Sequence, residues 1–205
     1  MGWTYLFDGT STKGWRGYNK DSFPSIGWII EDGTLRHVAG AGGGDIIYEK
    51  KFSNFELSFE WKISEAGNSG VFILAQEIPD QAIYMSAPEF QILDNDKHPD
   101  AKLGIDGNRT ATSLYDMIPA KPQNTKHAGE WNCAGIIVNN GKVSYISNGE
   151  TVVEFTIWTD EWYAMVANSK FKDWPNFVNP AKEGYIGLQD HGDDVWFRNI
   201  KIKEL

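Results

Sequence analysis

The chain has 205 residues with 41% hydrophobic and 23% charged side chains, which suits one globular domain with a sizeable core. Its 28 acidic residues outnumber 19 basic ones, and the net charge of −9 argues against nucleic acid or anionic membranes as partners. No apolar run approaches the roughly 20 residues of a membrane helix, and the single cysteine, Cys133, excludes an internal disulfide.

Strand-like segments dominate the chain. Residues 27–38 hold two short runs around Asp32-Gly33, which is a strong signal for a β-hairpin. Residues 55–63 (FELSFEWKI) alternate apolar and polar side chains at every position, as expected for a strand with one buried face. Further strands are expected at residues 69–75, 88–94, 133–157, 184–191 and 194–205.

Turn and cap signals complete the predicted architecture. Asn-Gly pairs interrupt residues 133–157 twice, so this segment is expected to form a three-stranded meander. Thr159 is a potential N-cap for a helix over residues 160–171, and residues 113–120 are a weaker helical or loop segment. Many short strands with one or two short helices predict an all-β jelly-roll sandwich of two antiparallel sheets, in a single domain over residues 1–205.

The polar faces of three predicted strands carry side chains that are suited to chemistry. In chain order these are Glu60, Lys62, Glu89, Gln91, Tyr185, Gln189 and His191. Carboxylates, amides and imidazoles bind sugar hydroxyls and transfer protons. A plain solvated sheet face is the alternative, and it is the commoner fate of a polar strand face. The recurrence of Gln, Tyr and His favours a groove on the open face of a curved sheet.

Metal-binding signals are weaker. Residues 94–100 (DNDKHPD) place three aspartates and His98 at alternate positions, as in a calcium loop. Pro99 occupies the place of the turn glycine of an EF-hand, so an acidic surface loop is favoured. The four histidines are scattered, and a metal site would have to be assembled by the fold. These signals by themselves assign no ligands to a divalent metal ion.

Several motifs occur in the order of one known family. They are LFDGTSTKGW (6–15), GNSGVF (67–72), EFQILDN (89–95), SLYDMIPA (113–120), GEWN (129–132), SNGETVVEF (147–155), SKF (169–171) and GYIGLQDHGDDVWFRNIKIKEL (184–205). With these motifs the sequence resembles the 3-keto-disaccharide hydrolase domain family over essentially the whole chain. The resemblance implies a concanavalin A-like jelly roll with a curved sheet. It also implies a carbohydrate substrate, a glycoside already oxidised to a ketone at C3 of the sugar.

The implied chemistry is a β-elimination. A ketone at C3 acidifies the C2 proton, so a base can remove it and the C1 substituent can leave; addition of water then gives net hydrolysis. The candidate base is His191 or Glu89. Lys170, in the SKF motif, is the candidate cation for the developing enolate, and Tyr115 is the candidate acid or hydrogen-bond donor. A divalent metal held by carboxylates and His191 could take the role of Lys170.

Other polar residues are expected to orient the sugar. The candidate substrate-binding residues are Glu60, Asn68, Gln91, Asp94, Arg109 and Gln189. Structural roles stay open for some candidates. Asp94 lies at a strand end, where a carboxylate can bond loop backbone, and His191 could stabilise a turn. Lys170 could lie along a helix end, and Arg198 is expected to form a structural ion pair.

A carbohydrate-binding module with the same groove is the alternative function. Its sugar-stacking residues would be Trp15, Trp28, Trp158 or Trp174. The titratable candidates favour the enzyme, because binding alone requires amides and aromatic rings but no acid–base pair. The resemblance also implies glycan use at a bacterial cell envelope. We therefore expect a periplasmic or envelope location, with a leader peptide that this chain does not include, and leave a cytoplasmic location open.

Overall fold

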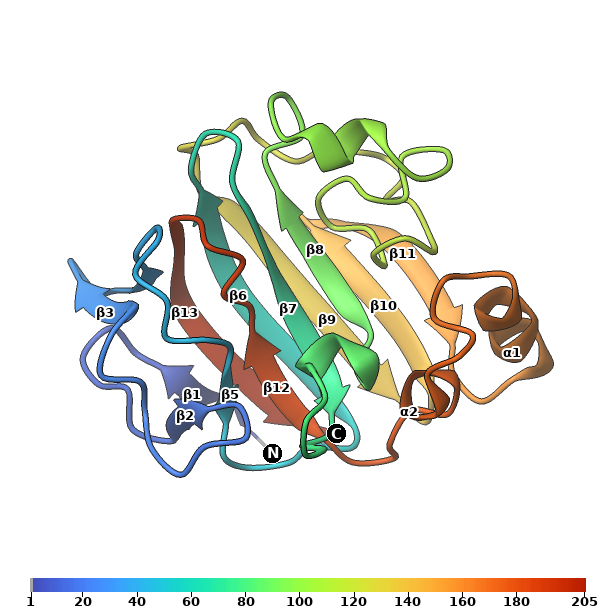
Figure 1. The fold of residues 1–205 in the computed structure, drawn as a ribbon, viewed down its shortest axis with the longest axis horizontal. Coiled ribbons are helices and arrows are strands. Elements are labelled where there is room, and N and C mark those ends of the chain that lie inside the picture. The colour runs from blue at the N-terminus through green and yellow to red at the C-terminus, as the bar shows by residue number, and fades with distance from the viewer. Residues whose placement is uncertain (1) are drawn as a thin grey trace.

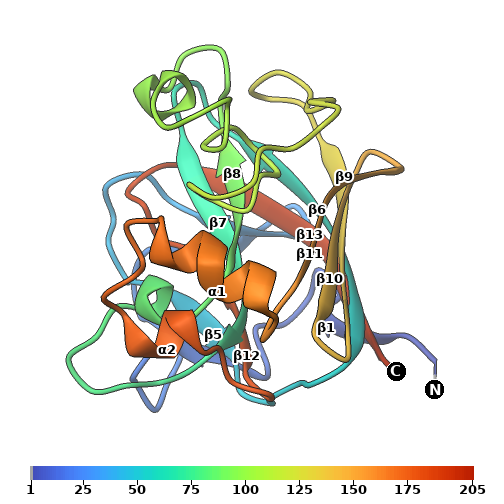
Figure 2. The ribbon, with the colours of Figure 1, turned by 90° about the vertical axis from the view of Figure 1, so that its right-hand side faces the viewer.

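The computed structural model describes residues 2–205, and these residues form two antiparallel β-sheets that pack face to face (Figure 1, Figure 2). The larger sheet contains β1 (Thr4–Phe7), β3 (Trp28–Glu31), β4 (Thr34–His37), β6 (Phe55–Ile63), β9 (Asn132–Asn139), β10 (Lys142–Ser147), β11 (Glu150–Thr156) and β13 (Val195–Glu204). The smaller sheet contains β2 (Trp15–Gly17), β5 (Ile46–Tyr48), β7 (Asn68–Ala75), β8 (Glu89–Leu93) and β12 (Tyr185–Leu188).

In both sheets, several neighbouring strands come from distant parts of the chain. The larger sheet has the order β11-β10-β9-β6-β13-β4-β3, with β1 paired to β13. The smaller sheet has the order β2-β5-β12-β7-β8, so β8 is an edge strand. This arrangement confirms the predicted jelly-roll sandwich of two antiparallel sheets.

Local sequence explains the hairpins. Asp32 and Gly33 both have positive φ angles, 48° and 74°, as the two central residues of a type I′ turn require. Asn148 and Gly149 repeat this geometry with 46° and 88°, and the predicted meander is formed by β9, β10 and β11. Each turn therefore sets the register of the strands that it joins.

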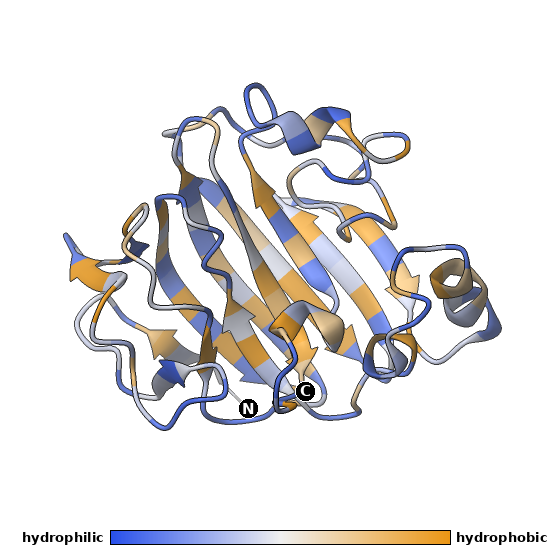
Figure 3. Cartoon of the chain, viewed as in Figure 1, coloured by the Kyte–Doolittle hydropathy of each residue, from blue (hydrophilic) through white to orange (hydrophobic). Residues whose placement is uncertain are grey.

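The core lies between the sheets. The apolar residues of β6 point inward and are almost fully buried, and Phe59 contacts Phe90 of β8 with ring centres 5.4 Å apart. Hydrophobic and hydrophilic residues alternate along β8, as Figure 3 shows. Phe90 and Ile92 belong to the core, so Glu89 and Gln91 point to the opposite, outer face of the smaller sheet.

Short helical segments cover part of that outer face. Helix α1 (Asp160–Ala167) begins after Thr159, whose side chain accepts a hydrogen bond from Trp162 N, as predicted. It ends four residues before the predicted limit. The 3-10 helix η1 (Ile83–Met85) lies near β7 and α2 (Pro175–Val178), and Figure 2 shows α2 on the side of the smaller sheet. Helix α1 lies next to α2 and to β11 of the larger sheet. No helix among residues 2–205 is long and apolar enough to cross a membrane.

The segment over residues 113–120 is a loop and not a helix. Its start pairs with the edge strand β8: Gln91 N donates to Ser113 O at 3.1 Å, and Tyr115 N donates to Glu89 O at 3.2 Å. An edge strand leaves such backbone groups free to pair with a neighbouring segment. The pairing holds Tyr115 beside the outer face of β8.

Candidate functional site

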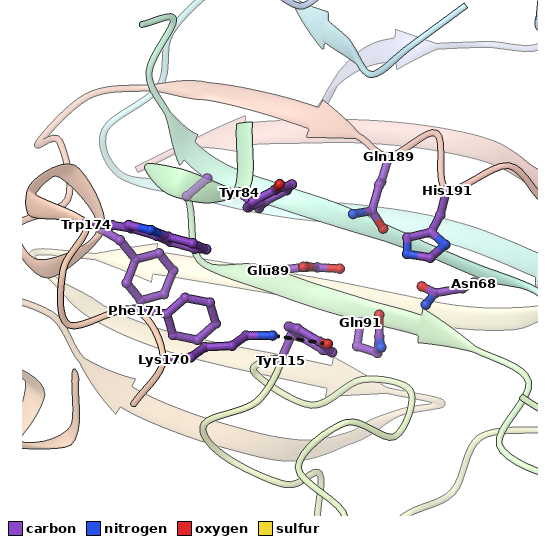
Figure 4. Close-up of a pocket in the computed structure, with 12 residues that line it drawn as sticks. Asn68, Tyr84, Glu89, Gln91, Tyr115, Lys170, Phe171, Trp174, Gln189 and His191 are labelled. Atoms are coloured by element: carbon purple, nitrogen blue, oxygen red, sulfur yellow. Dashed lines mark hydrogen bonds between the residues drawn. The ribbon is translucent and has the colours of Figure 1, made fainter. Parts of the chain in front are cut away.

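A pocket of about 360 Å³ opens on the outer face of the smaller sheet. Its floor comes from the sheet: Glu89 and Gln91 from β8, Asn68 from β7, and Gln189 and His191 from the segment after β12 (Figure 4). Its walls come from Tyr84, Ala87, Tyr115, Lys170, Phe171, Trp174 and Phe177. The pocket thus combines strands and loops that are far apart in the sequence.

The GNSG motif makes room for the central carboxyl. Gly70 of β7 pairs with Gln91 of β8, and a side-chain carbon at Gly70 would collide with the carboxyl group of Glu89. A larger residue here would force the Glu89 carboxyl group to move, so this glycine serves close packing and not a turn. This contact gives a structural reason for the glycine in a motif that the sequence marked only by resemblance.

Three buried amide oxygens in the pocket have no hydrogen-bond partner among residues 2–205. They are Asn68 Oδ1, Gln91 Oε1 and Gln189 Oε1. The amide nitrogen of Gln91 is used, since it donates to Arg109 O at 3.1 Å. Buried polar atoms are normally paired, so these oxygens are suited to accept hydrogen bonds from hydroxyl groups of a ligand.

The carboxyl group of Glu89 has a strongly changed acidity. Burial raises its pKa to about 8, and the negative charge of Asp45 adds to this effect, while the positive charge of Lys170 opposes it. At neutral pH the group is mostly protonated and close to its titration point. A carboxyl group in this state can both take and give a proton near pH 8.

Lys170 and Tyr115 form a pair at the pocket wall. Lys170 Nζ lies 3.3 Å from the Tyr115 hydroxyl and 4.3 Å from the centre of the Tyr115 ring. Burial, followed by the negative charge of Asp100, raises the pKa of Tyr115 above its usual range. The phenol therefore stays protonated, and the pair presents one O–H donor and one cation to the pocket.

Arg109 supports this pair from outside the pocket. It forms ion pairs with Asp100 at 2.9 Å and with Asp116 at 2.5 Å, and its guanidinium lies 5.7 Å from the Tyr115 ring centre. Arg109 does not line the pocket. The prediction that Arg109 lies at the sugar is therefore corrected: its Nε and Nη1 donate to two aspartates next to the Tyr115 loop.

A buried histidine fixes the segment that carries Gln189 and His191. The His37 ring is fully buried, and its nitrogens lie 3.0 Å from Asp193 O, 2.9 Å from Gly42 O and 3.0 Å from Asp190 Oδ1. Asp193 Oδ2 in turn accepts a hydrogen bond from Asn68 N at 2.9 Å. His191 itself is exposed at the rim of the pocket.

Glu60 lies away from the pocket, contrary to the prediction. It belongs to β6, a strand of the larger sheet, so its side chain points to the outer face of that sheet. There Glu60 forms an ion pair with Arg198 at 2.9 Å and accepts a hydrogen bond from Asn199. The expected ion pair of Arg198 is confirmed, and Lys62 shares this outer face.

Asp94 also lies outside the pocket. Its Oδ2 accepts a hydrogen bond from Ala66 N at 2.7 Å, and its Oδ1 accepts one from Asp96 N at 3.1 Å. Both oxygens therefore bond loop backbone. The prediction of a substrate contact is corrected in favour of the structural role that the strand-end position left open.

Sequence reasoning missed the aromatic wall. Tyr84, Phe171 and Phe177 line the pocket, but they come from short loops and helical turns that have no periodic pattern. The sequence marks Trp174 only as a stacking residue of a binding module. Of the other tryptophans considered for that role, Trp15, Trp28 and Trp158 do not line the pocket, and their indole nitrogens donate to Leu6 O, Gly44 O and Pro180 O.

The pocket residues do not provide a ready metal site. Among residues 2–205, no three His, Cys, Asp or Glu side chains lie close enough together to hold a metal ion. Glu89 and His191 are the pocket-lining side chains of these types. This arrangement does not fit the divalent ion considered from the sequence.

Comparisons with known proteins agree with the fold and the motifs. The sequence model of the 3-keto-alpha-glucoside-1,2-lyase-like domain matches residues 2–203. A 3-keto-disaccharide hydrolase of Bacteroides thetaiotaomicron is 50% identical over an alignment of length 229. The alignment covers 100% of this chain and 79% of that protein.

Two crystal structures from Parabacteroides distasonis, both described as candidate glycosyl hydrolases, are also similar. The first has a TM-score of 0.88 at 30% identity and is matched over 100% of this chain and 94% of that chain. The second has a TM-score of 0.77 at 26% identity, with 100% of both chains covered.

Proposed function

We propose that this chain, which belongs to the 3-keto-alpha-glucoside-1,2-lyase-like domain family, cleaves glycosides that carry a ketone at C3 of the sugar. The observation that carries the proposal is the buried carboxyl of Glu89, with a pKa of about 8, on the same pocket floor as the unpaired amide oxygens and beneath the Lys170–Tyr115 pair. The 50% identical relative is named for hydrolysis of 3-keto-disaccharides.

The proposed reaction has two stages. A base removes the C2 proton, the C1–O bond breaks with its electron pair, and the leaving oxygen takes up a proton, which leaves an enone in the sugar ring. Water then adds at C1, and a proton returns to C2. The sum is one glycoside plus one water, giving a 3-keto sugar and a free alcohol.

Glu89 is the proposed base. A base is most effective when its pKa is close to the working pH, and the pKa of Glu89 is about 8. Its burial also excludes bulk water from the carboxylate, which strengthens it as a proton acceptor. His191 is exposed at the rim and is assigned to contact with the sugar at the pocket mouth.

Lys170 and Tyr115 are the proposed stabilising pair. Charge develops on the C3 oxygen when the C2 proton leaves, and a preorganised cation and O–H donor lower the energy of that enolate. Lys170 supplies the charge, and Tyr115 supplies the hydrogen bond or the proton for the leaving oxygen. The amide oxygens of Asn68, Gln91 and Gln189 accept hydrogen bonds from the sugar hydroxyls.

Release of an alcohol from matched glycosides tests the proposal. The wild-type protein is incubated with methyl 3-keto-glucosides of both anomeric forms and with their unoxidised parents, each with and without EDTA. Release of methanol from a keto sugar alone is expected, and EDTA is expected to leave the rate unchanged. Release from the unoxidised parents at an equal rate would contradict the elimination, because no acidic C2 proton exists there.

A sugar-binding module is the second candidate function. The unpaired amide oxygens and Trp174 favour it, because acceptors and an aromatic ring suffice to bind a sugar. Calorimetric binding of the keto glycosides without release of alcohol would support it. The periplasmic or envelope location expected from the resemblance stays a prediction.

A further inference from the structure

The two ends of the pocket differ in chemistry. At one end lie the amide groups and the imidazole, and at the other end lie Tyr84, Phe171 and Trp174, with Glu89 and Tyr115 between them (Figure 4). The amide end holds the unpaired acceptor oxygens. The opposite end holds mainly carbon atoms. One ligand that fills both ends must therefore carry a polar part and an apolar part.

The aromatic end is a connected set of rings. Phe171 stacks on Phe177 with ring centres 4.2 Å apart, and Trp174 lies 5.4 Å from Phe171. Tyr84, from η1, lies 5.6 Å from Trp174. Phe171 and Phe177 are buried, whereas Tyr84 is 43% exposed and Trp174 is partly exposed. The two outer rings are thus available to contact a ligand.

Lys170 joins the two ends. Its Nζ lies 3.3 Å from the Tyr115 hydroxyl and 5.4 Å from the ring centre of Phe171. In the proposed reaction Lys170 and Tyr115 lie at the reacting oxygens. The unpaired amide oxygens at the opposite end are matched to the hydroxyl groups of the keto sugar. With the sugar bound there, a substituent on the leaving oxygen beside Tyr115 extends toward Phe171 and Trp174, so the leaving group lies at the aromatic end.

The aromatic end offers few partners for hydroxyl groups. Apart from Lys170 Nζ at its border, the side-chain polar atoms of the described residues that line it are the Tyr84 hydroxyl and the Trp174 indole nitrogen. A second sugar ring would bring several hydroxyl groups and would lose hydrogen bonds to water there. A flat aromatic ring would instead form offset or edge contacts with Trp174 and Tyr84.

We propose that the aromatic end of the pocket, formed by Tyr84, Phe171, Trp174 and Phe177, is a leaving-group subsite for aromatic alcohols. Aryl 3-keto-glycosides are then preferred over 3-keto-disaccharides. This inference rests on the proposed function for the reaction, but the binding preference is testable without turnover.

Inhibition constants of unoxidised glycosides test the subsite independently of leaving-group acidity. Phenyl glucoside, cyclohexyl glucoside and a glucose disaccharide compete against methyl 3-keto-glucoside. Phenyl glucoside is expected to bind about tenfold more tightly than the other two, because ring contacts of this kind contribute about that factor. A disaccharide that binds as tightly as phenyl glucoside would overturn the proposal.

Variants locate the preference. Trp174→Ala and the more exposed Tyr84→Ala are each expected to remove most of the advantage of phenyl glucoside over cyclohexyl glucoside and the disaccharide. Trp3→Ala is the control, because Trp3 is 41% exposed and does not line the pocket. An advantage that persists in both pocket variants would overturn the subsite.

The two proposals fail in different ways. If no 3-keto-glucoside is cleaved, the proposed function fails, and calorimetry of the three unoxidised glycosides still measures the subsite. If methyl 3-keto-glucoside is cleaved and phenyl glucoside shows no advantage, the subsite fails and the function stands.

Discussion

Strands β6 and β8 carry similar side chains but differ in environment. On each strand a glutamate alternates with core residues: Glu60 on β6 and Glu89 on β8. Glu60 is half-buried on the outer face of the larger sheet and pairs with Arg198 at 2.9 Å. Glu89 is buried in the pocket, and its pKa is about 8. The same pattern therefore gives a surface ion pair in one place and a group with altered acidity in the other.

The cause of the difference is what covers each outer face. The polar side chains of β6 alternate with buried ones, and water solvates their charges. Every residue of β8 is buried, because Tyr115, Lys170 and the aromatic residues lie over its outer face. Burial removes water from a carboxylate and so disfavours its charged form. The contrast teaches that a polar strand face acquires its chemistry from the loops above it.

The largest expected effect separates the two glutamates in activity. Glu89→Gln keeps the shape but removes the proton acceptor, so kcat for a methyl 3-keto-glucoside is expected to fall roughly 10³-fold. Glu60→Gln is the matched control, with a change below about twofold, because surface pairs contribute little. An equal fall of kcat in Glu89→Gln and Glu60→Gln would contradict the different roles of the two glutamates.

In wild type, kcat/KM is expected to rise as pH increases through about 8, since the ionised carboxylate is the base.

The next effect concerns stability and pH. The pKa of Glu89 is about 8 when folded against an ordinary value of 4.5, so the unfolded chain releases this proton first as pH rises. Wild type should therefore lose stability between about pH 4.5 and 8 from this group, on the order of 4 kcal/mol. Glu89→Gln should lack this loss and gain relative stability at pH 9. Urea unfolding at pH 4.5 and pH 9 measures the free energy of unfolding of both proteins. An equal change with pH in wild type and Glu89→Gln would contradict this prediction.

Lysines on the two faces give a smaller contrast. Lys170→Met removes the cation beside Tyr115, and kcat is expected to fall about 10²-fold because an electrostatic stabiliser of the enolate is lost. Lys62→Met on β6 serves as the comparison, since Lys62 lies against the rings of Trp131 and Trp196 and away from the pocket. Steady-state kinetics on both variants checks this. A fall in KM alone for Lys170→Met would speak against a role in the chemical step.

The smallest effect concerns the ion pair of β6. Glu60→Ala leaves Arg198 beside solvent, so the free energy of unfolding is expected to fall by about 1 kcal/mol or less. Denaturant unfolding in low salt and in 1 M salt measures the loss, and the difference should shrink in high salt because exposed charges are screened. A loss of several kcal/mol that does not depend on salt would contradict the description of Glu60–Arg198 as a solvent-exposed ion pair.

Much of the fold could be predicted from local sequence. Alternation over 55–63 identified β6 to the residue, and Asp32-Gly33 and the two Asn-Gly pairs marked the hairpin and the meander. The limit of α1 was overestimated, because the helix ends at Ala167 and the SKF motif forms part of the loop that follows. Hairpins and amphipathic strands depend on neighbours in the chain, so their signals are local.

The candidate site was predicted in part. Glu89, Gln91, Asn68, Gln189, His191, Lys170 and Tyr115 do line one pocket, and their proposed roles stay predictions. Glu60, Asp94 and Arg109 do not line it. Alternation shows which side chains of a strand share a face, but it does not show which sheet the strand joins or whether its outer face is covered.

The sequence by itself determined the strands, the tight turns, the polar character of the outer faces and the family motifs, because these depend on side-chain type and spacing. Only the tertiary structure decided that β8 lies at the edge of the smaller sheet under a loop and an aromatic wall, whereas β6 lies in the larger sheet. Burial of Glu89, and with it the pKa of about 8, results from contacts between segments that are distant in the chain. Desolvation is a property of the assembled surroundings of a group, and no local pattern encodes it.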